Sequence, residues 1–109
     1  MFSIKEIEAS ELAQWVSDAS HQLRVIDVRQ AEEVAMGTVP KAEHLPLHTL
    51  PARIHELSPS EKLVMVCRSG ARSAQACLFL QQQGYSNVYN LSGGMMRWLQ
   101  SGFPAHQLG

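Results

Sequence analysis

The sequence has 109 residues with a formal net charge of −1 at pH 7, and 45% of its residues are hydrophobic. This length predicts one domain, residues 1–109, with a hydrophobic core of its own. The lack of a basic surplus excludes a typical nucleic-acid-binding protein, and no apolar run is long enough to cross a membrane. Charged residues interrupt the start of the chain, so we predict no leader peptide and expect a soluble, cytoplasmic protein.

Short apolar segments alternate with amphipathic ones through the first half of the chain, which is typical of strands that alternate with helices. Residues 10–19 predict a helix that is capped by Ser10 and buries Leu12, Trp15, Val16 and Ala19. In chain order, we expect a short edge strand at 2–4, this helix, a buried strand at 23–28, a short helix at 30–36 that ends at Gly37, a brief strand at 43–45 and a helix at 47–57 with Leu50, Ile54 and Leu57 on one face.

The second half continues the same alternation. In chain order, we expect a buried strand at 62–67, a helix that starts near Arg72 or Ser73 and ends at Gly84, a strand at 87–91 and a final helix that carries Met95, Met96, Trp98 and Leu99. The helix before Gly84 is expected to direct inward Ala74, Cys77, Leu78 and Phe79. This pattern predicts an α/β fold with a five-stranded, mostly parallel sheet and helices on both faces.

The loop at 67–73, Cys-Arg-Ser-Gly-Ala-Arg-Ser, joins the most apolar strand to a helix. Such a loop presents backbone N–H groups and the positive end of a helix at the carboxyl edge of the sheet, where parallel sheets place their sites. A cysteine beside Arg68 and Arg72 in that environment ionises more easily than a free thiol, and the thiolate is the nucleophile. The alternative is a buried strand cysteine. That alternative leaves both arginines without a partner, so we favour Cys67 as a catalytic residue.

The remainder of this loop is the predicted substrate-binding site, made of Arg68, Ser69, Gly70, Ala71, Arg72 and Ser73. Arg68 is the expected contact for an anionic substrate. Arg72 has two open interpretations, because an arginine fork suits substrate binding and pairing with a carboxylate equally well. Asp27 and Arg29 are expected to support the site structurally through ion pairs with Glu33 or with a loop arginine.

The sequence predicts no metal site and no cofactor. Neither Cys67 nor Cys77 has another Cys or a His two to four residues away, as zinc ligands do. The two thiols should stay reduced in an intracellular protein, and we interpret Cys77 as a packed helix residue rather than a second reactive cysteine. Gly93 and Gly94 are expected to allow close packing or a positive φ rather than to bind phosphate.

With these residues identified, the chain resembles the single-domain rhodaneses, a family of sulfurtransferases. The resemblance extends from about residue 4 to Trp98 and depends on four segments that occur in order. These segments are Ile26–Arg29 with Glu33 and Gly37, Val39–Pro40 with Ala42, the loop at 67–73, and Leu91–Gly94 with Trp98. The chain departs from the family at Gly37–Lys41, where the family often has Gly-His-Ile-Pro-Gly, a turn that lies away from the nucleophile.

The resemblance implies a rhodanese-like fold and the transfer of sulfane sulfur through a persulfide on Cys67. In that mechanism a donor such as thiosulfate gives its outer sulfur to Cys67, sulfite leaves, and a thiol or cyanide accepts the sulfur. A small sulfur-carrier protein is the alternative partner, in a sulfur relay. Neither nucleic acid nor a membrane is expected as a partner.

Two other classes of protein remain as alternatives. Cys-dependent phosphatases and arsenate reductases also place a cysteine and an arginine around an anion-binding loop, but phosphatase loops have five residues between the two. Only four residues separate Cys67 from Arg72, and this tighter ring suits one sulfur atom better than a tetrahedral phosphate. The other alternative is a non-catalytic rhodanese-like binding module. Family members of that kind usually lack the cysteine, which this chain keeps.

Overall fold

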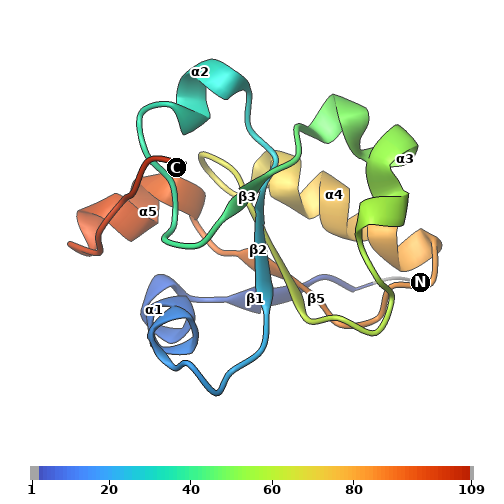
Figure 1. Cartoon of the computed structure of the whole chain (residues 1–109), viewed down its shortest axis with the longest axis horizontal. Helices are drawn as coiled ribbons and strands as arrows, with labels where there is room; N and C mark the ends of the chain where they lie inside the picture. The colour runs from blue at the N-terminus through green and yellow to red at the C-terminus, as the bar shows by residue number, and fades with distance from the viewer. Residues whose placement is uncertain (1–2, 109) are drawn as a thin grey trace.

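Five strands form one sheet in the order β1-β5-β4-β2-β3 in the computed structural model, which describes residues 3–108 (Figure 1). The strands are β1 (Lys5–Ile7), β2 (Arg24–Asp27), β3 (Glu43–His44), β4 (Leu63–Val66) and β5 (Val88–Leu91). Every pair of neighbouring strands is parallel. The expected α/β fold is confirmed, and the sheet is wholly rather than mostly parallel.

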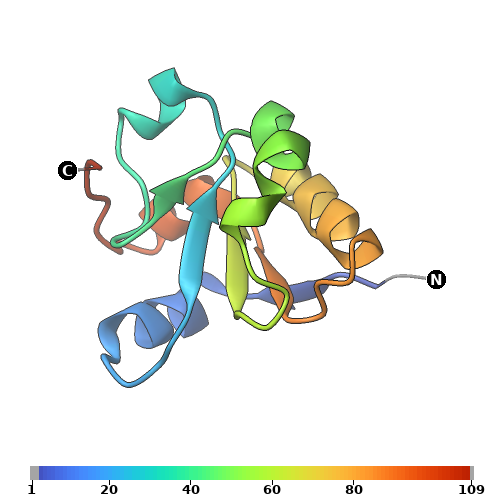
Figure 2. The ribbon, with the colours of Figure 1, turned by 45° about the vertical axis from the view of Figure 1, so that its right-hand side comes forward.

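Helices cover both faces of this sheet. The α-helices are α1 (Ala9–Ser17), α2 (Ala31–Val34), α3 (Leu50–Arg53), α4 (Ala71–Gln82) and α5 (Gly94–Gln100). Figures 1 and 2 show α1 and α5 on one side of the sheet and α3 and α4 on the other, and the buried residues form one cluster on each side. Within residues 3–108, none of the helices is long and apolar enough to cross a membrane.

The central strand β4 contributes side chains to both faces. Leu63 and Met65 join the cluster under α3 and α4, whereas Val64 and Val66 join the cluster under α1 and α5. This alternation follows from the two-residue repeat of a strand. Because both faces are covered, all four side chains are fully buried and the strand sequence is continuously apolar. Cys67 follows this strand directly and belongs to the cluster under α3 and α4.

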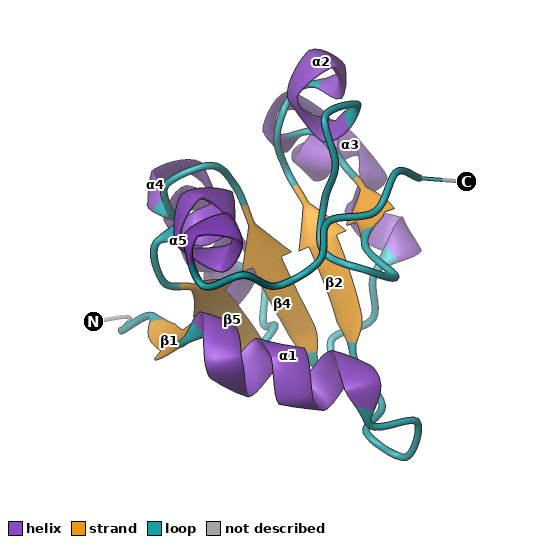
Figure 3. Ribbon diagram, turned by 90° about the vertical axis from the view of Figure 1, so that its left-hand side faces the viewer, coloured by secondary structure: helices purple, strands orange, loops and turns teal. Residues whose placement is uncertain are grey.

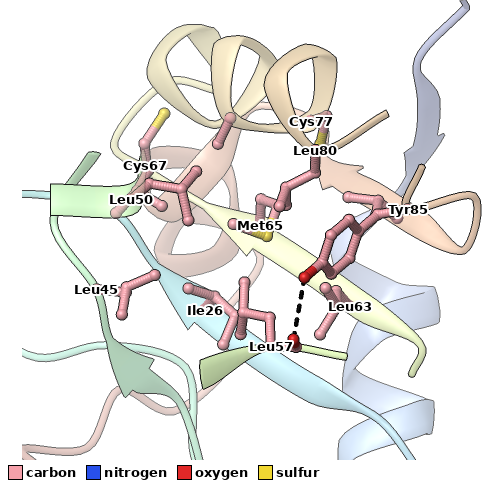
Figure 4. Packing of buried hydrophobic residues seen from close by; sticks show 13 residues of the cluster. Ile26, Leu45, Leu50, Leu57, Leu63, Met65, Cys67, Cys77, Leu80 and Tyr85 are labelled. Atoms are coloured by element: carbon pink, nitrogen blue, oxygen red, sulfur yellow. Dashed lines mark hydrogen bonds between the residues drawn. The ribbon is translucent and has the colours of Figure 1, made fainter. Parts of the chain in front are cut away.

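The cluster under α3 and α4 also holds Cys77 and Tyr85 (Figure 4). Figure 4 shows Cys67 near the start of α4 and Cys77 further along the same helix. The Tyr85 hydroxyl donates a hydrogen bond of 3.0 Å to the carbonyl oxygen of Leu57. This bond satisfies the one polar atom of an otherwise apolar side chain and attaches the segment after α3 to the core.

The first strand lies three residues later than the sequence predicted, at 5–7 rather than 2–4. Ser3 and Ile4 precede the strand, and residue 2 lies outside the described residues. Ile7 is only 3% exposed and pairs with Leu91 of β5. Burial of Ile7 therefore sets the register, which a short polar strand leaves weakly specified in the sequence.

The predicted cap of the first helix is wrong. α1 starts at Ala9, so Ser10 lies inside the helix, and Glu8 occupies the capping position without a side-chain hydrogen bond. Leu12 and Val16 are buried as expected. Ala19 is exposed because the helix ends before it, at Ser17.

The helix predicted at 47–57 is broken into short pieces. A 3₁₀ turn at Leu47–Thr49 precedes α3, and a second 3₁₀ turn at Ile54–Glu56 follows it. Pro51 explains the first break, since proline has no N–H to donate to the carbonyl four residues before it. Leu50 and Leu57 are nevertheless buried in the same cluster, with Ile54 packed against it.

The buried faces of the last two helices differ from the prediction, and in α4 the predicted Ala74 and Phe79 are only half-buried. In α4 the buried side chains are Ser73, Ala76, Cys77 and Leu80, whereas Leu78 is 36% exposed. In α5 the buried side chains are Met95 and Trp98, whereas Met96 is 46% and Leu99 is 54% exposed. Each helix contacts the sheet along one stripe at i, i+3 and i+4 spacing, so the apolar residues outside that stripe face away from the sheet.

Candidate active site

The candidate site lies where the parallel strands end. Cys67 follows the last residue of β4, and Asp27 is the last residue of the neighbouring strand β2. Figure 3 shows the arrowheads of both strands at the same edge of the sheet. In open parallel sheets this carboxyl edge is the usual position of a site. None of the Cys67 surface is exposed, so the sulfur is enclosed by the loop rather than displayed on it.

The loop directs hydrogen-bond donors at the Cys67 sulfur. Gly70 has a φ of +103° at the capping position of α4, a conformation that favours glycine. Its N–H donates to Cys67 Sγ at 3.1 Å, and Ser73 Oγ lies 3.3 Å from the same sulfur. Both groups belong to the start of α4, the positive end of the helix dipole. The arrangement is suited to hold negative charge on sulfur.

The carbonyl groups of the loop face the other way, toward α5. Met95 N–H donates to the Cys67 carbonyl oxygen at 2.8 Å, and Met96 N–H donates to the Arg68 carbonyl oxygen at 3.0 Å. Gly94, with φ of +57°, makes this approach possible, because a Cβ there would lie closer than 3.0 Å to both carbonyl oxygens. The expectation of close packing and positive φ in the Gly-Gly pair is confirmed. With its carbonyl oxygens held by α5, the loop leaves its N–H groups free to face the sulfur.

The pKa values of the two cysteines in the cluster shift in opposite directions. Burial is the largest single influence on the pKa of Cys67 and raises it, but the Ser73 hydroxyl and the N–H groups of Ser73, Gly70 and Ser69 together lower it below its ordinary value. The arginines expected from the sequence are not the leading cause. Cys77 has no such donors among its main influences, and burial raises its pKa to about 12. Of the two, Cys67 is the thiol prepared to ionise.

Arg72 pairs with a carboxylate from α2. Its Nη1 and Nη2 each lie 2.7 Å from one oxygen of Glu33. These hydrogen bonds lower the pKa of Glu33 to about 2, against the opposing effect of partial burial. Glu33 Oε1 also accepts the N–H of Gln30, in a capping box that begins α2. The pair therefore connects α2 to the first turn of α4.

Asp27 and Arg29 form a separate, more deeply buried pair. Arg29 Nη2 lies 2.8 Å from Asp27 Oδ2 and also donates to the Gly37 carbonyl oxygen at 2.8 Å. Thr38 Oγ1 donates to Asp27 Oδ2 at 2.6 Å. The structure thus brings the three predicted support residues into two pairs, Asp27 with Arg29 and Glu33 with Arg72, rather than into one network. The buried pair fixes the segment between β2 and the turn after α2.

Arg68 and Ser69 are exposed at the outer side of the loop. Within residues 3–108, no carboxylate lies within ion-pair distance of Arg68. Its charge is therefore available to an anion that approaches from solvent. Ala71 starts α4 and is exposed as well.

Sequence reasoning missed two residues behind the loop, Asn90 and Glu6. Asn90 lies in β5 and is only 3% exposed; its Nδ2 donates to the Gly70 carbonyl oxygen at 3.1 Å and to the Glu6 carboxylate at 3.2 Å. Its Oδ1 accepts a hydrogen bond from the Ser73 hydroxyl. The available signal was a lone amide in the apolar segment 88–91, because a buried polar side chain requires partners.

A groove of about 610 Å³ lies at the opposite, amino edge of the sheet. Its lining includes Leu23 and Arg24 at the start of β2, Lys62 before β4 and Asn87 before β5. The Arg24 charge is already paired with Glu43 and Glu61, and Cys67 is not part of this groove. Across residues 3–108, no group of three or more His, Cys, Asp and Glu side chains is gathered as a metal site.

These observations define a class: a parallel α/β domain in which a helix N-terminus and backbone amides enclose one cysteine at the carboxyl edge. The sequence model of the "Rhodanese-like domain" matches residues 8–101. The chain belongs to the rhodanese-like family, as the four sequence segments indicated.

Similar proteins agree with this assignment. The chain is 43% identical to a protein of Allochromatium vinosum named "Sulfurtransferase", over 93% of this chain and 94% of the relative. Over 88% of the chain it is 34% identical to half of a Bacillus subtilis protein, YrkF, which is provisionally named a sulfur carrier protein. The crystal structure of a rhodanese-like domain protein from Staphylococcus aureus is 30% identical and superposes with a TM-score of 0.85, over 97% of this chain and all of that one.

Proposed function

We propose that this protein is a sulfurtransferase that carries sulfane sulfur as a persulfide on Cys67. The observation that supports this most directly is the pair of donors at Cys67 Sγ, the Gly70 N–H at 3.1 Å and the Ser73 hydroxyl at 3.3 Å. They lie at the N-terminus of α4 and favour a thiolate there. The name of the Allochromatium vinosum relative agrees with this activity.

In the first half of the reaction, the Cys67 thiolate attacks the outer sulfur of a donor such as thiosulfate. A new S–S bond forms, the S–S bond of thiosulfate breaks, and sulfite leaves with the bonding electron pair. Cys67 then holds a persulfide whose outer sulfur carries one negative charge. Backbone N–H groups at the start of α4 are suited to stabilise that charge. The enclosed position of Cys67 favours a donor that presents a single terminal sulfur atom.

In the second half, an acceptor thiolate or cyanide attacks the outer sulfur of the persulfide. The S–S bond of the persulfide breaks, and its electron pair returns to Cys67 as the resting thiolate. A small sulfur-carrier protein is a second candidate acceptor. Similarity to a protein provisionally named a sulfur carrier supports this candidate.

The two loop arginines have different proposed roles. Arg68 is exposed and has no carboxylate partner within the described residues, so we assign it to attract an anionic donor. Arg72 places both guanidinium nitrogens on Glu33, so we assign it to brace the loop against α2. This pairing also argues against the phosphatase alternative, in which the loop arginine needs its fork free for phosphate.

Transfer of sulfur from thiosulfate to cyanide tests the proposal, with thiocyanate as the measured product. The wild type should turn over and Cys67→Ser should be inactive, because a hydroxyl forms no persulfide. Cys77→Ser is the matched control, since it removes the other buried thiol, and it should keep most of the activity. Turnover that survives in folded Cys67→Ser would refute the assignment.

A further inference from the structure

The Ser73 hydroxyl lies between two groups that both use its proton. Its oxygen is 3.3 Å from Cys67 Sγ and is also hydrogen-bonded to Asn90 Oδ1. A hydroxyl has one proton to donate, whereas an amide oxygen only accepts. Ser73 is fully buried, so no solvent molecule shares this proton from outside the protein.

The orientation of the Asn90 amide is fixed by its other end. Nδ2 faces the Gly70 carbonyl oxygen at 3.1 Å and both Glu6 carboxylate oxygens at 3.2 Å. Turning the amide over would place its oxygen against these three oxygens, where there is no proton to share. Oδ1 therefore has to face Ser73, and the fold holds it there as a hydrogen-bond acceptor for the Ser73 hydroxyl.

When Cys67 is a neutral thiol, every acceptor in this group has a proton donor. The Cys67 S–H then donates to Ser73 Oγ, and the Ser73 O–H donates to Asn90 Oδ1. When Cys67 loses its proton, both the thiolate and Asn90 Oδ1 need the same Ser73 proton. One of these buried acceptors must then lose its hydrogen bond with Ser73, and an unsatisfied buried acceptor is costly.

We propose that Asn90 is a positioning residue that competes with the Cys67 sulfur for the single proton of the Ser73 hydroxyl, and that Glu6 holds Asn90 in the competing orientation. Asn90 thereby limits how readily Cys67 ionises. Such a limit has a chemical benefit, because the nucleophilicity of a thiolate falls as the pKa of its thiol falls. The inference concerns only the ionisation of Cys67, so it stands apart from the reaction that Cys67 performs.

Other charged and titratable groups belong to the elements around the same sulfur. α4 contributes Arg72 and Cys77, both of which interact electrostatically with Cys67. The loop contributes Arg68, which follows Cys67 directly, and β1 contributes Glu6 through Asn90. Asn90→Ala leaves all of these charges in place. It is therefore a cleaner perturbation than any substitution of Glu6, which would also remove a negative charge.

The test is the pH dependence of iodoacetamide alkylation at Cys67, followed by peptide mass analysis so that Cys77 does not contribute. The readout is the midpoint of the pH profile, because the absolute rate also depends on access to an enclosed sulfur. Asn90→Ala should lower this midpoint by about half to one pH unit, since the Ser73 hydroxyl becomes free to serve the thiolate. Asn87→Ala, at the residue directly before β5, is the control and should leave the midpoint unchanged.

The same substitution in a Ser73→Ala background decides whether Asn90 acts through the hydroxyl. With no proton to compete for, Asn90→Ala should produce no shift there. A shift of equal size in both backgrounds, or no lowering in the wild-type background, would overturn the proposal. Asn90→Leu is measured in parallel because it fills the space of the amide without an acceptor. It should reproduce the shift of Asn90→Ala, and a folded Asn90→Leu variant with the wild-type midpoint would also overturn the proposal.

Discussion

Replacing Gly94 by alanine should destabilise the protein and disturb the Cys67 loop, because Gly94 lies where α5 packs against that loop. The φ of +57° at this position costs a residue with a Cβ about 1–2 kcal/mol. The new Cβ would also lie closer than 3.0 Å to the carbonyl oxygens of Cys67 and Arg68, which are backbone atoms of the loop. Relief of that contact separates α5 from the loop and weakens the two hydrogen bonds from Met95 and Met96, at about 0.5–1.5 kcal/mol each. The summed loss of unfolding free energy is about 2–5 kcal/mol.

Gly84→Ala supplies the matched control for this prediction. Gly84 also has a positive φ, +94°, but a Cβ there meets no atom within 4 Å. Urea unfolding should therefore show a loss of only about 1–2 kcal/mol for Gly84→Ala. Where Gly94→Ala still folds, its persulfide formation should also slow, while that of Gly84→Ala should not. Equal losses of stability in the two variants would refute the idea that the approach of α5 to the loop requires glycine.

Three further substitutions divide the roles of the remaining side chains. Arg68→Ala should lower kcat/KM for thiosulfate on the order of tenfold to a hundredfold and leave kcat/KM for a neutral sulfur donor unchanged. Arg72→Ala should slow the reaction with both donors alike and lower the unfolding temperature. A loss confined to thiosulfate in Arg72→Ala would instead make Arg72 a substrate contact. The pKa of Glu33 is about 2 in the folded protein, below its ordinary value of 4.5, so its ion pair stabilises the fold fully above about pH 4.5 and loses effect as the pH falls toward 2. Glu33→Gln should therefore be less stable than the wild type by about 1 kcal/mol at neutral pH, a figure that allows for solvent screening of this partly exposed pair. The difference should shrink in acid, and a difference that keeps its neutral-pH size at pH 2 would contradict the ion-pair interpretation.

The parts of the site that could be predicted from sequence are local ones. The apolar run before Cys67 and the glycine within the loop together define a strand, a turn and a helix start, because each depends on neighbouring residues only. Local patterns of this kind leave few alternative secondary structures for the segment around Cys67.

Contacts between distant segments were beyond the sequence pattern. Arg72 and Glu33 are 39 residues apart, and their pairing depends on α2 lying beside the first turn of α4. Asn90 reaches Ser73 only because β5 neighbours β4 in the sheet. The sequence offered two interpretations of Arg72 and none of Asn90, since neither strand order nor helix placement can be read from periodicity.

The predicted helix boundaries and buried faces were wrong where two local sequence signals competed. The apolar spacing of Leu50, Ile54 and Leu57 favoured one helix at 47–57, but Pro51 removes a hydrogen bond that such a helix needs. In α4, Leu78 and Phe79 are as apolar as Leu80, and only the orientation of the helix on the sheet decides that Leu80 is buried and Leu78 is not. Tertiary packing, rather than composition, selects the inward stripe.

The central claim is that Cys67 carries the transferred sulfur, and intact mass measurement after incubation with thiosulfate tests it most directly. The wild type and Cys77→Ser should each gain the mass of one sulfur atom, and peptide analysis should locate it on Cys67. Cyanide should then remove the added mass, because the outer sulfur of a persulfide leaves as thiocyanate. An unchanged mass, or a sulfur atom that remains on Cys67→Ser, would contradict the assignment.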